Sequence, residues 1–377
     1  MATLRCGFRK QEDNAMNIAI VGLAHGHYGA YCRQWAAHPE WDIIPTKGWD
    51  HDTARLTQNA QNLKLDAVES LDDLVKDTSI DAFLITAETS LHADLVEAIA
   101  PTRKPIALQK PMALTIKEAD RIIHAVEDNH TPFTMLWQMR CDPQNIWMKK
   151  FMESGILGQV FQFRRRHNLG LCLNPANANI WHCIPELNRD IWADDCAHPA
   201  DLIYWLFGMP KSVTAEIETL YNPQMPHDNG VVIFRYPEKK LIAEVACSFT
   251  ASSAEVTTEI YAEKGTVVQR YGDAVTASMP RDPDAVGMKY YLTNDQKWYD
   301  CTQWPSPNSQ AVRIGGLAQP MAEFFHGQRK PICTAFEGRE SLKMIIASLI
   351  SSVEGRRVYM DDPLIANFPL PLKRGLI

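Results

Sequence analysis

One segment near the N-terminus has the residue types of a phosphate-binding turn: Val21-Gly22-Leu23-Ala24-His25-Gly26-His27. It follows a β-branched run at 17–21 and precedes a helix-compatible stretch that reaches residue 35. A strand, a glycine turn and a helix N-terminus together offer backbone N–H groups and a positive dipole end to a pyrophosphate. The strict G-x-G-x-x-G pattern is not met, because Ala24 and His27 replace two of the glycines. Taken alone, the segment also fits an ordinary strand-to-helix turn.

Asp50 is the next residue whose position suggests cofactor chemistry. It ends a weaker strand pattern that begins at Ile43 and Ile44. An acidic residue at this strand end accepts hydrogen bonds from the adenosine ribose of a dinucleotide and repels a 2′-phosphate. The spacing from Gly22 exceeds the usual ~20 residues, and capping of the following helix is the alternative role. The pattern therefore favours NAD over NADP as the cofactor.

These residues need a parallel sheet to bring them together. Further buried strands are expected at 81–86, 106–108 and 133–137, and helices at 90–100 and 115–128. Strands that alternate with helices of roughly ten to fifteen residues are typical of βαβ units. Residues 16–138 are therefore predicted to form a doubly wound Rossmann domain, and residues 1–15 a flexible extension that precedes it.

The pattern changes after residue 138. Helices are expected at 145–154 and 192–207, a strand at 160–167, further β segments at 212–219, 230–236, 241–249 and 256–262, and a late helix at 338–355. The turn-forming residues at 228–230 and 237–239 indicate antiparallel hairpins. Residues 139–377 are therefore predicted to form an α+β domain with a large, mostly antiparallel open sheet, and the overall class is α/β.

Composition argues against several other classes of protein. A length of 377 residues favours two domains, and a net charge of −7 argues against nucleic-acid binding, which needs a basic surface. No apolar run is long enough to span a bilayer, so no membrane partner is expected. The nine cysteines are scattered without a C-x-x-C pair, and the first residues lack the apolar core of a signal peptide. These features favour a reducing compartment and a cytoplasmic location.

Three later segments occur in a recognisable order: Thr86-Ala87-Glu88-Thr89-Ser90-Leu91-His92, Gln109-Lys110-Pro111 and Asp194-Asp195-Cys196-Ala197-His198-Pro199-Ala200-Asp201. Together with the first turn, they resemble the glucose–fructose oxidoreductase/inositol dehydrogenase family (Gfo/Idh/MocA), whose pattern includes TPNxxH, EKP and DxGxHxxD. The resemblance covers nearly the whole chain from Met16. Glu88, Thr89 and Gln109 depart from the family pattern, so the loops that face the nucleotide are expected to use different hydrogen bonds.

The resemblance implies an NAD(P)-dependent oxidoreductase that oxidises a secondary hydroxyl of a sugar, polyol or sugar derivative, or reduces the matching ketone. It also implies a homodimer or homotetramer formed through the C-terminal sheet. The implied cofactor contacts lie in the first turn, at the second strand end and in two later loops: Gly22, Leu23, Ala24, His25, Gly26, His27, Asp50, Ala87, Glu88, Thr89, His92, Gln109 and Lys110. The catalytic positions implied are Lys110, Asp194 and His198.

This catalytic set also has a chemical rationale. Oxidation of an alcohol requires a base for the hydroxyl proton, and histidine, with an ordinary pKa of ~6.5, suits that role. Asp194 lies four residues before His198 on a predicted helix, so its carboxylate is expected to orient the ring. Lys110 is expected to stabilise the developing alkoxide. For His198 taken alone, a buried structural histidine is the alternative.

Other candidates are less specific. Asn168, Trp181 and His182 are expected to line the substrate pocket, where Trp181 either stacks on a sugar face or belongs to the core. Several nearby side chains are of metal-ligating types, but their spacing matches no closed zinc site, and no metal is expected. Two rival functions stay open: a redox-neutral glycosidase or lyase that uses NAD transiently, and a non-catalytic dinucleotide-binding sensor. The sequence does not specify the substrate, its stereochemistry or the direction of the reaction.

Overall fold

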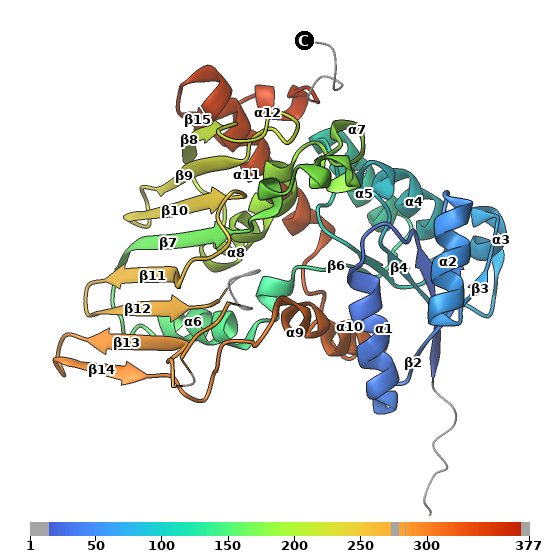
Figure 1. The fold of residues 1–377 in the computed structure, drawn as a ribbon, viewed down its shortest axis with the longest axis horizontal. Coiled ribbons are helices and arrows are strands. Elements are labelled where there is room, and N and C mark those ends of the chain that lie inside the picture. The colour runs from blue at the N-terminus through green and yellow to red at the C-terminus, as the bar shows by residue number, and fades with distance from the viewer. Residues whose placement is uncertain (1–14, 273–278, 283, 371–377) are drawn as a thin grey trace, which may run out of the picture.

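The computed structural model describes residues 15–272, 279–282 and 284–370 (Figure 1). Nearly all of the N-terminal extension expected at residues 1–15 lies outside the described residues. The first half of the chain forms a parallel sheet in the order β3-β2-β1-β4-β5-β6, which is the strand order of Rossmann domains. Its strands are β1 (Met16–Val21), β2 (Ile43–Trp49), β3 (Asp66–Ala67), β4 (Ala82–Ile85), β5 (Ile106–Leu108) and β6 (Phe133–Met135). The predicted doubly wound domain is confirmed.

Helices cover both faces of this sheet, so its strands are buried on both sides. Successive β1 side chains alternate between two apolar clusters, Ile18 and Ile20 in one, Ala19 and Val21 in the other. The helices are α1 (His27–Ala37), α2 (Thr53–Leu63), α3 (Leu71–Lys76), α4 (His92–Ile99) and α5 (Ile116–Asp128). Side chains of α1 and α2 belong to the first cluster, and those of α3, α4 and α5 belong to the second.

The second half of the chain builds a nine-stranded sheet in the order β14-β13-β12-β11-β7-β10-β9-β8-β15. Only the β7–β10 pair is parallel among the described pairs, so the prediction of a mostly antiparallel sheet is also confirmed. The strands are β7 (Val160–Asn168), β8 (Ser212–Glu218), β9 (Asn229–Tyr236), β10 (Leu241–Ser248), β11 (Val256–Ala262), β12 (Gly265–Arg270), β13 (Met288–Leu292), β14 (Lys297–Asp300) and β15 (Val358–Tyr359).

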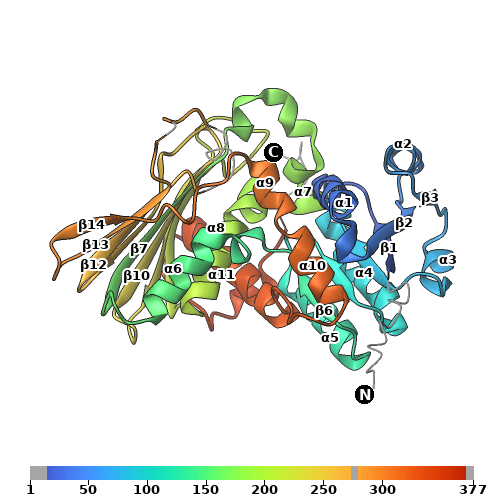
Figure 2. The same ribbon diagram turned by 90° about the horizontal axis from the view of Figure 1, so that it is seen from below.

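Helices α6 (Pro143–Glu153), α8 (Ala197–Phe207) and α11 (Ala335–Glu354) lie on one face of this sheet, between the sheet and the Rossmann domain (Figure 2). The other helices of this part are α7 (Pro185–Asn188), α9 (Gln310–Gly315), α10 (Ala318–Phe325) and α12 (Leu364–Asn367). Helix α11 begins at a capping box formed by Thr334 and Glu337 and packs against both α5 and β8. One continuous apolar core therefore joins the two sheets.

The chain returns to the Rossmann domain near its end. Helices α9 and α10 pack against α1, and the Trp35 Nε1 atom donates to the Ala318 carbonyl at 3.0 Å. Leu317, Met321 and Phe325 join the cluster that contains Ile18 and Ile20. Residues from the C-terminal half thus complete one face of the N-terminal sheet. The sequence pattern placed the domain boundary between residues 138 and 139, but these later residues also pack against the first domain.

Candidate active site

The turn after β1 lies at the carboxyl ends of the parallel strands, where dinucleotide sites are found. Gly22 has a φ of +77°, and a Cβ atom there would lie 2.4 Å from the Cα of Ala87, in the turn after β4. Gly22 is therefore required so that two neighbouring strand-end turns can approach each other. Helix α1 follows with Gly26 at its N-cap, and no side chain caps this end. Its first N–H groups suit an anionic ligand.

Asp50 lies at the end of β2, as predicted, and its carboxylate is fully engaged within the chain. One oxygen accepts a hydrogen bond from the backbone N–H of Leu23 at 2.6 Å, and the other accepts one from the backbone N–H of Asp52 at 2.8 Å. Arg55 adds a bidentate pair, with both N–O distances at 2.8 Å. Helix α2 is capped by Asp52 rather than Asp50, so the alternative role considered for Asp50 does not apply.

Arg55 is a residue of this region that the sequence reasoning missed. Its Nη2 atom lies 2.8 Å from Asp50 Oδ1 and 2.8 Å from Glu88 Oε1. These carboxylates hold the pKa of Arg55 above its ordinary value although partial burial acts to lower it. A cation fixed between two acids stands beside the predicted ribose position, where Arg side chains also accommodate a 2′-phosphate.

A group of imidazoles continues from the turn toward the second domain. The His25 ring meets the edge of His27 at 4.2 Å between centroids, and both ring nitrogens of His25 are buried without a hydrogen-bond partner in the described residues. Burial, followed by the neighbouring charges, lowers the pKa of His25 well below its ordinary value and that of His27 to about 3. Gln109 Nε2 lies 3.1 Å from His27 Nδ1, and Trp181 Nε1 donates to the Ala24 carbonyl at 3.1 Å. The predicted Trp181 thus touches the cofactor turn.

Lys110, delivered by the end of β5, is the cation of the predicted catalytic set. Its Nζ atom lies 3.1 Å from Asp194 Oδ1 and 3.6 Å from Asp195 Oδ1. Although burial acts against the charge of this amine, these carboxylates raise the pKa of Lys110. Burial likewise opposes ionisation of Asp194, but Lys110 and His182 hold the pKa of Asp194 well below its usual range. Both groups are therefore charged at neutral pH.

The partners of His198 differ from those expected. Asp194 pairs with His182, whose Nδ1 atom lies 2.9 Å from Asp194 Oδ2, whereas the His198 Nε2 atom lies 3.8 Å from Asp195 Oδ1. The segment Trp192–Cys196 is a π-helical turn, and its wider winding removes the i, i+4 alignment that a regular helix would give. Asp195, which approaches both Lys110 and His198, is not part of the catalytic set that the family motifs imply.

A cavity of about 180 Å³ brings the three predicted catalytic residues together with four other predicted site residues. It is lined by His25, Gly26, His27, Lys110, Leu169, Leu171, Ile180, His182, Asp194, Asp195, His198 and Gln310. Asn168 and Trp181, which were also expected to line the substrate pocket, are not among them, and the Asn168 amide donates to the Ser253 carbonyl at 2.7 Å. The predicted His92 is fully buried, with ring nitrogens 3.2 Å from the carbonyls of Ala87 and Met112, so it supports the strand-end loops.

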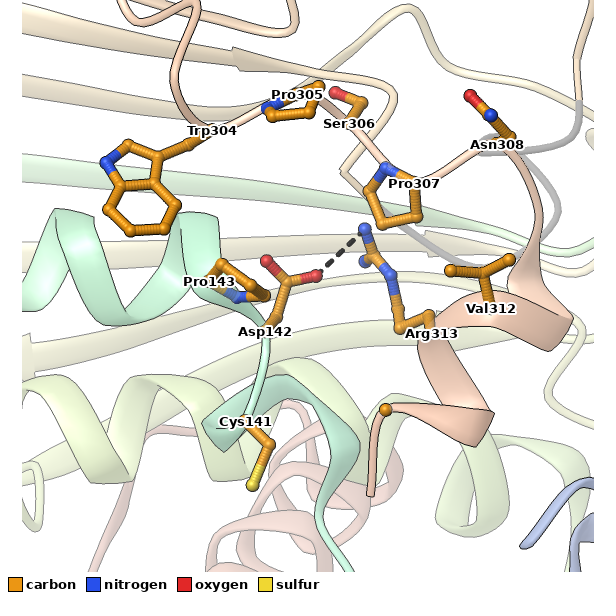
Figure 3. Close-up of a pocket in the computed structure, with 11 residues that line it drawn as sticks. Cys141, Asp142, Pro143, Trp304, Pro305, Ser306, Pro307, Asn308, Val312 and Arg313 are labelled. Atoms are coloured by element: carbon orange, nitrogen blue, oxygen red, sulfur yellow. Dashed lines mark ion pairs between the residues drawn. The ribbon is translucent and has the colours of Figure 1, made fainter. Parts of the chain in front are cut away.

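A second and larger cavity, of about 460 Å³, is lined by none of the predicted site residues (Figure 3). It is mostly apolar, and an ion pair of 3.0 Å joins Asp142 to Arg313 within it. Gln310 lines the catalytic cavity, while Val312 and Arg313 of the same helix line this one. The chemistry of the lining residues, rather than volume, identifies the smaller cavity as the candidate active site.

Comparison with known proteins identifies the family. Residues 16–136 match the model described as the oxidoreductase family with an NAD-binding Rossmann fold, and residues 146–268 match the GFO/IDH/MocA C-terminal domain. The chain therefore belongs to the Gfo/Idh/MocA oxidoreductase family, and its N-terminal domain is an NAD-binding Rossmann fold. The resemblance inferred from the sequence motifs is confirmed.

Several relatives have been named by activity. Inositol 2-dehydrogenase of Acidothermus cellulolyticus is 25% identical over 253 residues, which are 64% of this chain and 70% of the relative. Levoglucosan dehydrogenase of Pseudarthrobacter phenanthrenivorans is 25% identical over 158 residues, 42% of this chain and 40% of the relative. An uncharacterised oxidoreductase of Schizosaccharomyces pombe is 28% identical over 188 residues, 48% of this chain and 50% of the relative. The chain thus spans about half the length of some of these relatives.

Solved structures match over almost the whole chain. A levoglucosan dehydrogenase in complex with NADH and levoglucosan has a TM-score of 0.79 at 17% identity, covering 93% of this chain and 100% of that chain. An oxidoreductase from Agrobacterium radiobacter, in complex with NAD+, L-tartaric acid and magnesium, has a TM-score of 0.75 at 17% identity, covering 92% and 99%. At this level of identity the likeness shows a shared fold.

Two further properties bear on the class of protein. No helix in residues 15–272, 279–282 and 284–370 has the length and apolarity needed to cross a membrane. Within these same ranges, the structure contains no group of three or more metal-ligating side chains suited to a metal ion. Among the cysteines in the described residues, Cys32, Cys141, Cys172, Cys196, Cys301 and Cys333 are free thiols.

Proposed function

We propose that this chain oxidises a secondary hydroxyl of a sugar, a polyol or a sugar derivative with NAD+, or catalyses the reverse reduction. The observation that carries the proposal is the cavity in which Lys110, Asp194 and two histidines meet beside the β1–α1 turn. A buried cation next to a neutral imidazole suits the removal of a hydroxyl proton. The relatives named inositol and levoglucosan dehydrogenases support a polyhydroxylated substrate.

The residues around the turn fit a dinucleotide. The N-terminus of α1 has no side-chain cap, and the buried ring nitrogens of His25 lack a partner among the described residues. Residues 22–27 would hold the pyrophosphate, and Asp50 with Arg55 would face the adenosine ribose. NAD, when bound, supplies the nicotinamide that accepts a hydride from the substrate carbon.

The protein's own side chains would prepare the substrate for that transfer. The Lys110 ammonium group would hold the hydroxyl oxygen and stabilise its negative charge as the proton leaves. A histidine of the cavity would accept the proton, since imidazole is a suitable base when it is uncharged. His182 and His198 both line the cavity and are the candidates for this step.

A screen of sugars and polyols with NAD+ and NADP+ tests the proposal. Absorbance of the reduced cofactor and chromatography of the products are both recorded for each compound. Accumulation of the reduced cofactor with one class of compound supports a dehydrogenase. Release of a leaving group without such accumulation would favour the redox-neutral lyase or glycosidase, and tight NAD binding without any turnover would favour a sensor.

The exposed face of the nine-stranded sheet supports a proposal about assembly. In the described part of the chain, α6, α8 and α11 lie on the inner face, and no helix covers the outer one (Figure 2). Val231, Ile233 and Ile242 are exposed large apolar side chains on β9 and β10. Pairing of two copies through this face would bury these side chains. Light scattering of the native chain and of Ile233→Asp tests the pairing, which predicts a dimer or tetramer that the substitution weakens.

A further inference from the structure

We propose that the catalytic cavity binds an uncharged sugar or polyol, that it rejects sugar acids and sugar phosphates, and that Asp195 sets this preference. This inference rests on the proposed function, because it names the charge class of the substrate of that reaction. The motif DxGxHxxD leaves the position of Asp195 open. A carboxylate at this position is therefore a feature of this chain and not of the motif.

Asp195 lies in the π-helical turn that precedes α8. Its Oδ1 atom lies 3.6 Å from Lys110 Nζ, 3.8 Å from His198 Nε2 and 3.9 Å from His167 Nε2. All three distances exceed the range of about 2.7–3.2 Å for an N–H···O hydrogen bond. The Asp195 side chain is 13% exposed, compared with 3% for Asp194. Of these two carboxylates, Asp195 is therefore better able to accept a hydrogen bond from a ligand.

The one strong cation of the cavity is already paired. Among the described residues that line the cavity, Lys110 is the only lysine or arginine. Its Nζ atom lies 3.1 Å from Asp194 Oδ1 and 3.6 Å from Asp195 Oδ1. Although burial acts to lower it, these two acids raise the pKa of Lys110. An anionic group on a substrate would therefore compete with two carboxylates of the protein for one ammonium group.

The histidines of the cavity do not supply a second cation. Burial lowers the pKa of His25 and of His198 well below the ordinary value, and that of His27 to about 3, so these rings are uncharged at neutral pH. The Nδ1 atom of His182 lies 2.9 Å from Asp194 Oδ2, so this ring is engaged by a carboxylate. In the described lining of the cavity, each basic group is thus either uncharged or paired with an acid.

Hydroxyl groups and anions would therefore bind differently in this cavity. A hydroxyl donates to a carboxylate and accepts from an ammonium group, so the O–H groups of a sugar or polyol suit Asp195 and Lys110. A carboxylate or a phosphate dianion only accepts hydrogen bonds. Its charge would lie beside the like charge of Asp195 in a largely buried site, which is unfavourable.

Matched pairs of compounds, added to the screen of sugars and polyols, test the charge preference. The pairs are D-glucose with D-glucuronate, D-galactose with D-galacturonate, and myo-inositol with myo-inositol 1-phosphate. A substrate of another structure is paired with its own uronic acid or phosphate. In each pair that contains a substrate, kcat/KM should be at least ~tenfold higher for the uncharged member. Values of kcat/KM within about threefold of each other would overturn the inference and leave the proposed oxidation in place.

Substitutions at Asp195 test its role in this preference. Asp195→Asn removes the charge, keeps the shape of the side chain, and should reduce the preference at least ~threefold. A merely structural role would lower kcat for both members of a pair and leave their ratio unchanged, which would overturn the assignment. Asp195→Glu keeps the charge and should keep the preference. Asp128→Asn, at the exposed last residue of α5, is the matched control and should not alter the ratio.

Calorimetric titration of the NADH complex with the same pairs gives a readout that does not require turnover. The preference for the uncharged member should be stronger here than in kcat/KM with NAD+, because the reduced nicotinamide ring lacks the positive charge of the oxidised ring. Equal affinity of the two members, a preference for the anion, or no binding by any pair would overturn the inference. Absence of turnover with every compound would instead overturn the proposed function, whereas the calorimetric preference would still report on Asp195.

Discussion

The two ends of the candidate cofactor site differ in how far their polar groups are satisfied within the chain. At the ribose end, the Asp50 carboxylate accepts four hydrogen bonds from Leu23, Asp52 and Arg55. At the reacting end, which is the cavity around Lys110 and Asp194, buried ring nitrogens of His25 and His198 have no hydrogen-bond partner in the described residues. An unsatisfied buried polar group costs about 1–3 kcal/mol. The ribose end is therefore complete by itself, while the reacting end is built to be completed by ligands.

The difference indicates which residues set geometry and which meet the reactants. Asp50 fixes the β1–α1 turn through Leu23 and holds Arg55 in place, so it acts first as a structural residue. Burial lowers the pKa of His25 and His198 and keeps both rings uncharged, so they can exchange protons with a bound molecule. Substitutions at the two ends should therefore have different effects on turnover, stability and cofactor preference.

The largest effect is expected at Lys110. Lys110→Ala should lower kcat by ~10²–10³-fold, because the oxygen of the substrate loses its cation. It should also lower the free energy of unfolding by about 3–5 kcal/mol, since two buried carboxylates lose their counter-charge. Steady-state kinetics and urea unfolding measure the two effects. Lys117→Ala, on an exposed position of α5, is the control, and equal effects of both substitutions would refute the special role of Lys110.

Stability should depend on pH through the reacting end. Burial lowers the pKa of His25, His27 and His198, so below the ordinary value of about 6.5 the unfolded chain binds protons that the folded chain does not. The free energy of unfolding should then decrease as pH falls from about 6.5 toward 4, by up to ~1.4 kcal/mol per pH unit for each histidine. Urea unfolding at a series of pH values measures the slope. His25→Asn should make it shallower, and an unchanged slope would show that His25 does not contribute.

The smallest effect is expected at the ribose end. Glu88→Gln removes one of the two carboxylates that hold Arg55, with little change in shape. The Arg55 guanidinium, still paired with Asp50, should then have a donor available for a 2′-phosphate, and NADP affinity should rise about three- to tenfold relative to NAD, equivalent to roughly 1 kcal/mol. Calorimetric titration with both cofactors measures the change. Glu97→Gln, which faces Arg121 on the surface, is the matched control and should leave the ratio unchanged.

Much of the fold could be predicted because the strands carry local signals. The buried run at 17–21 corresponds to β1 (Met16–Val21), and the alternating segment at 256–262 coincides with β11 (Val256–Ala262). Strands β12, β13 and β14, together with helices α9 and α10, were not predicted. The packing of α10 against the Rossmann sheet involves contacts between residues far apart in the sequence, and no local pattern reports such contacts.

The family motifs named three residues that lie in one cavity, but they did not indicate how these residues pair with their neighbours. Lys110, Asp194 and His198 meet in one cavity, as the family motifs implied. The pairing of Asp194 with His182 depends on a π-helical turn and on a loop that folds back onto it, and neither has a signature in the sequence. Arg55 could have been found, because an arginine in the first turn of the helix after an acidic strand end is within reach of that acid.

The position of Lys110 between two carboxylates has a consequence for the net charge of the cavity. The one positive charge of Lys110 and the two negative charges of Asp194 and Asp195 leave this group of three side chains with one net negative charge. It lies beside His25 and His198, whose rings burial keeps uncharged. A buried net charge is unfavourable. The arrival of one proton would balance this charge and so be favoured. Oxidation of a bound alcohol would leave such a proton in the cavity once the hydride has passed to NAD+ and the alkoxide has become a neutral carbonyl, so the negative charge of the resting group would be balanced by the completed reaction.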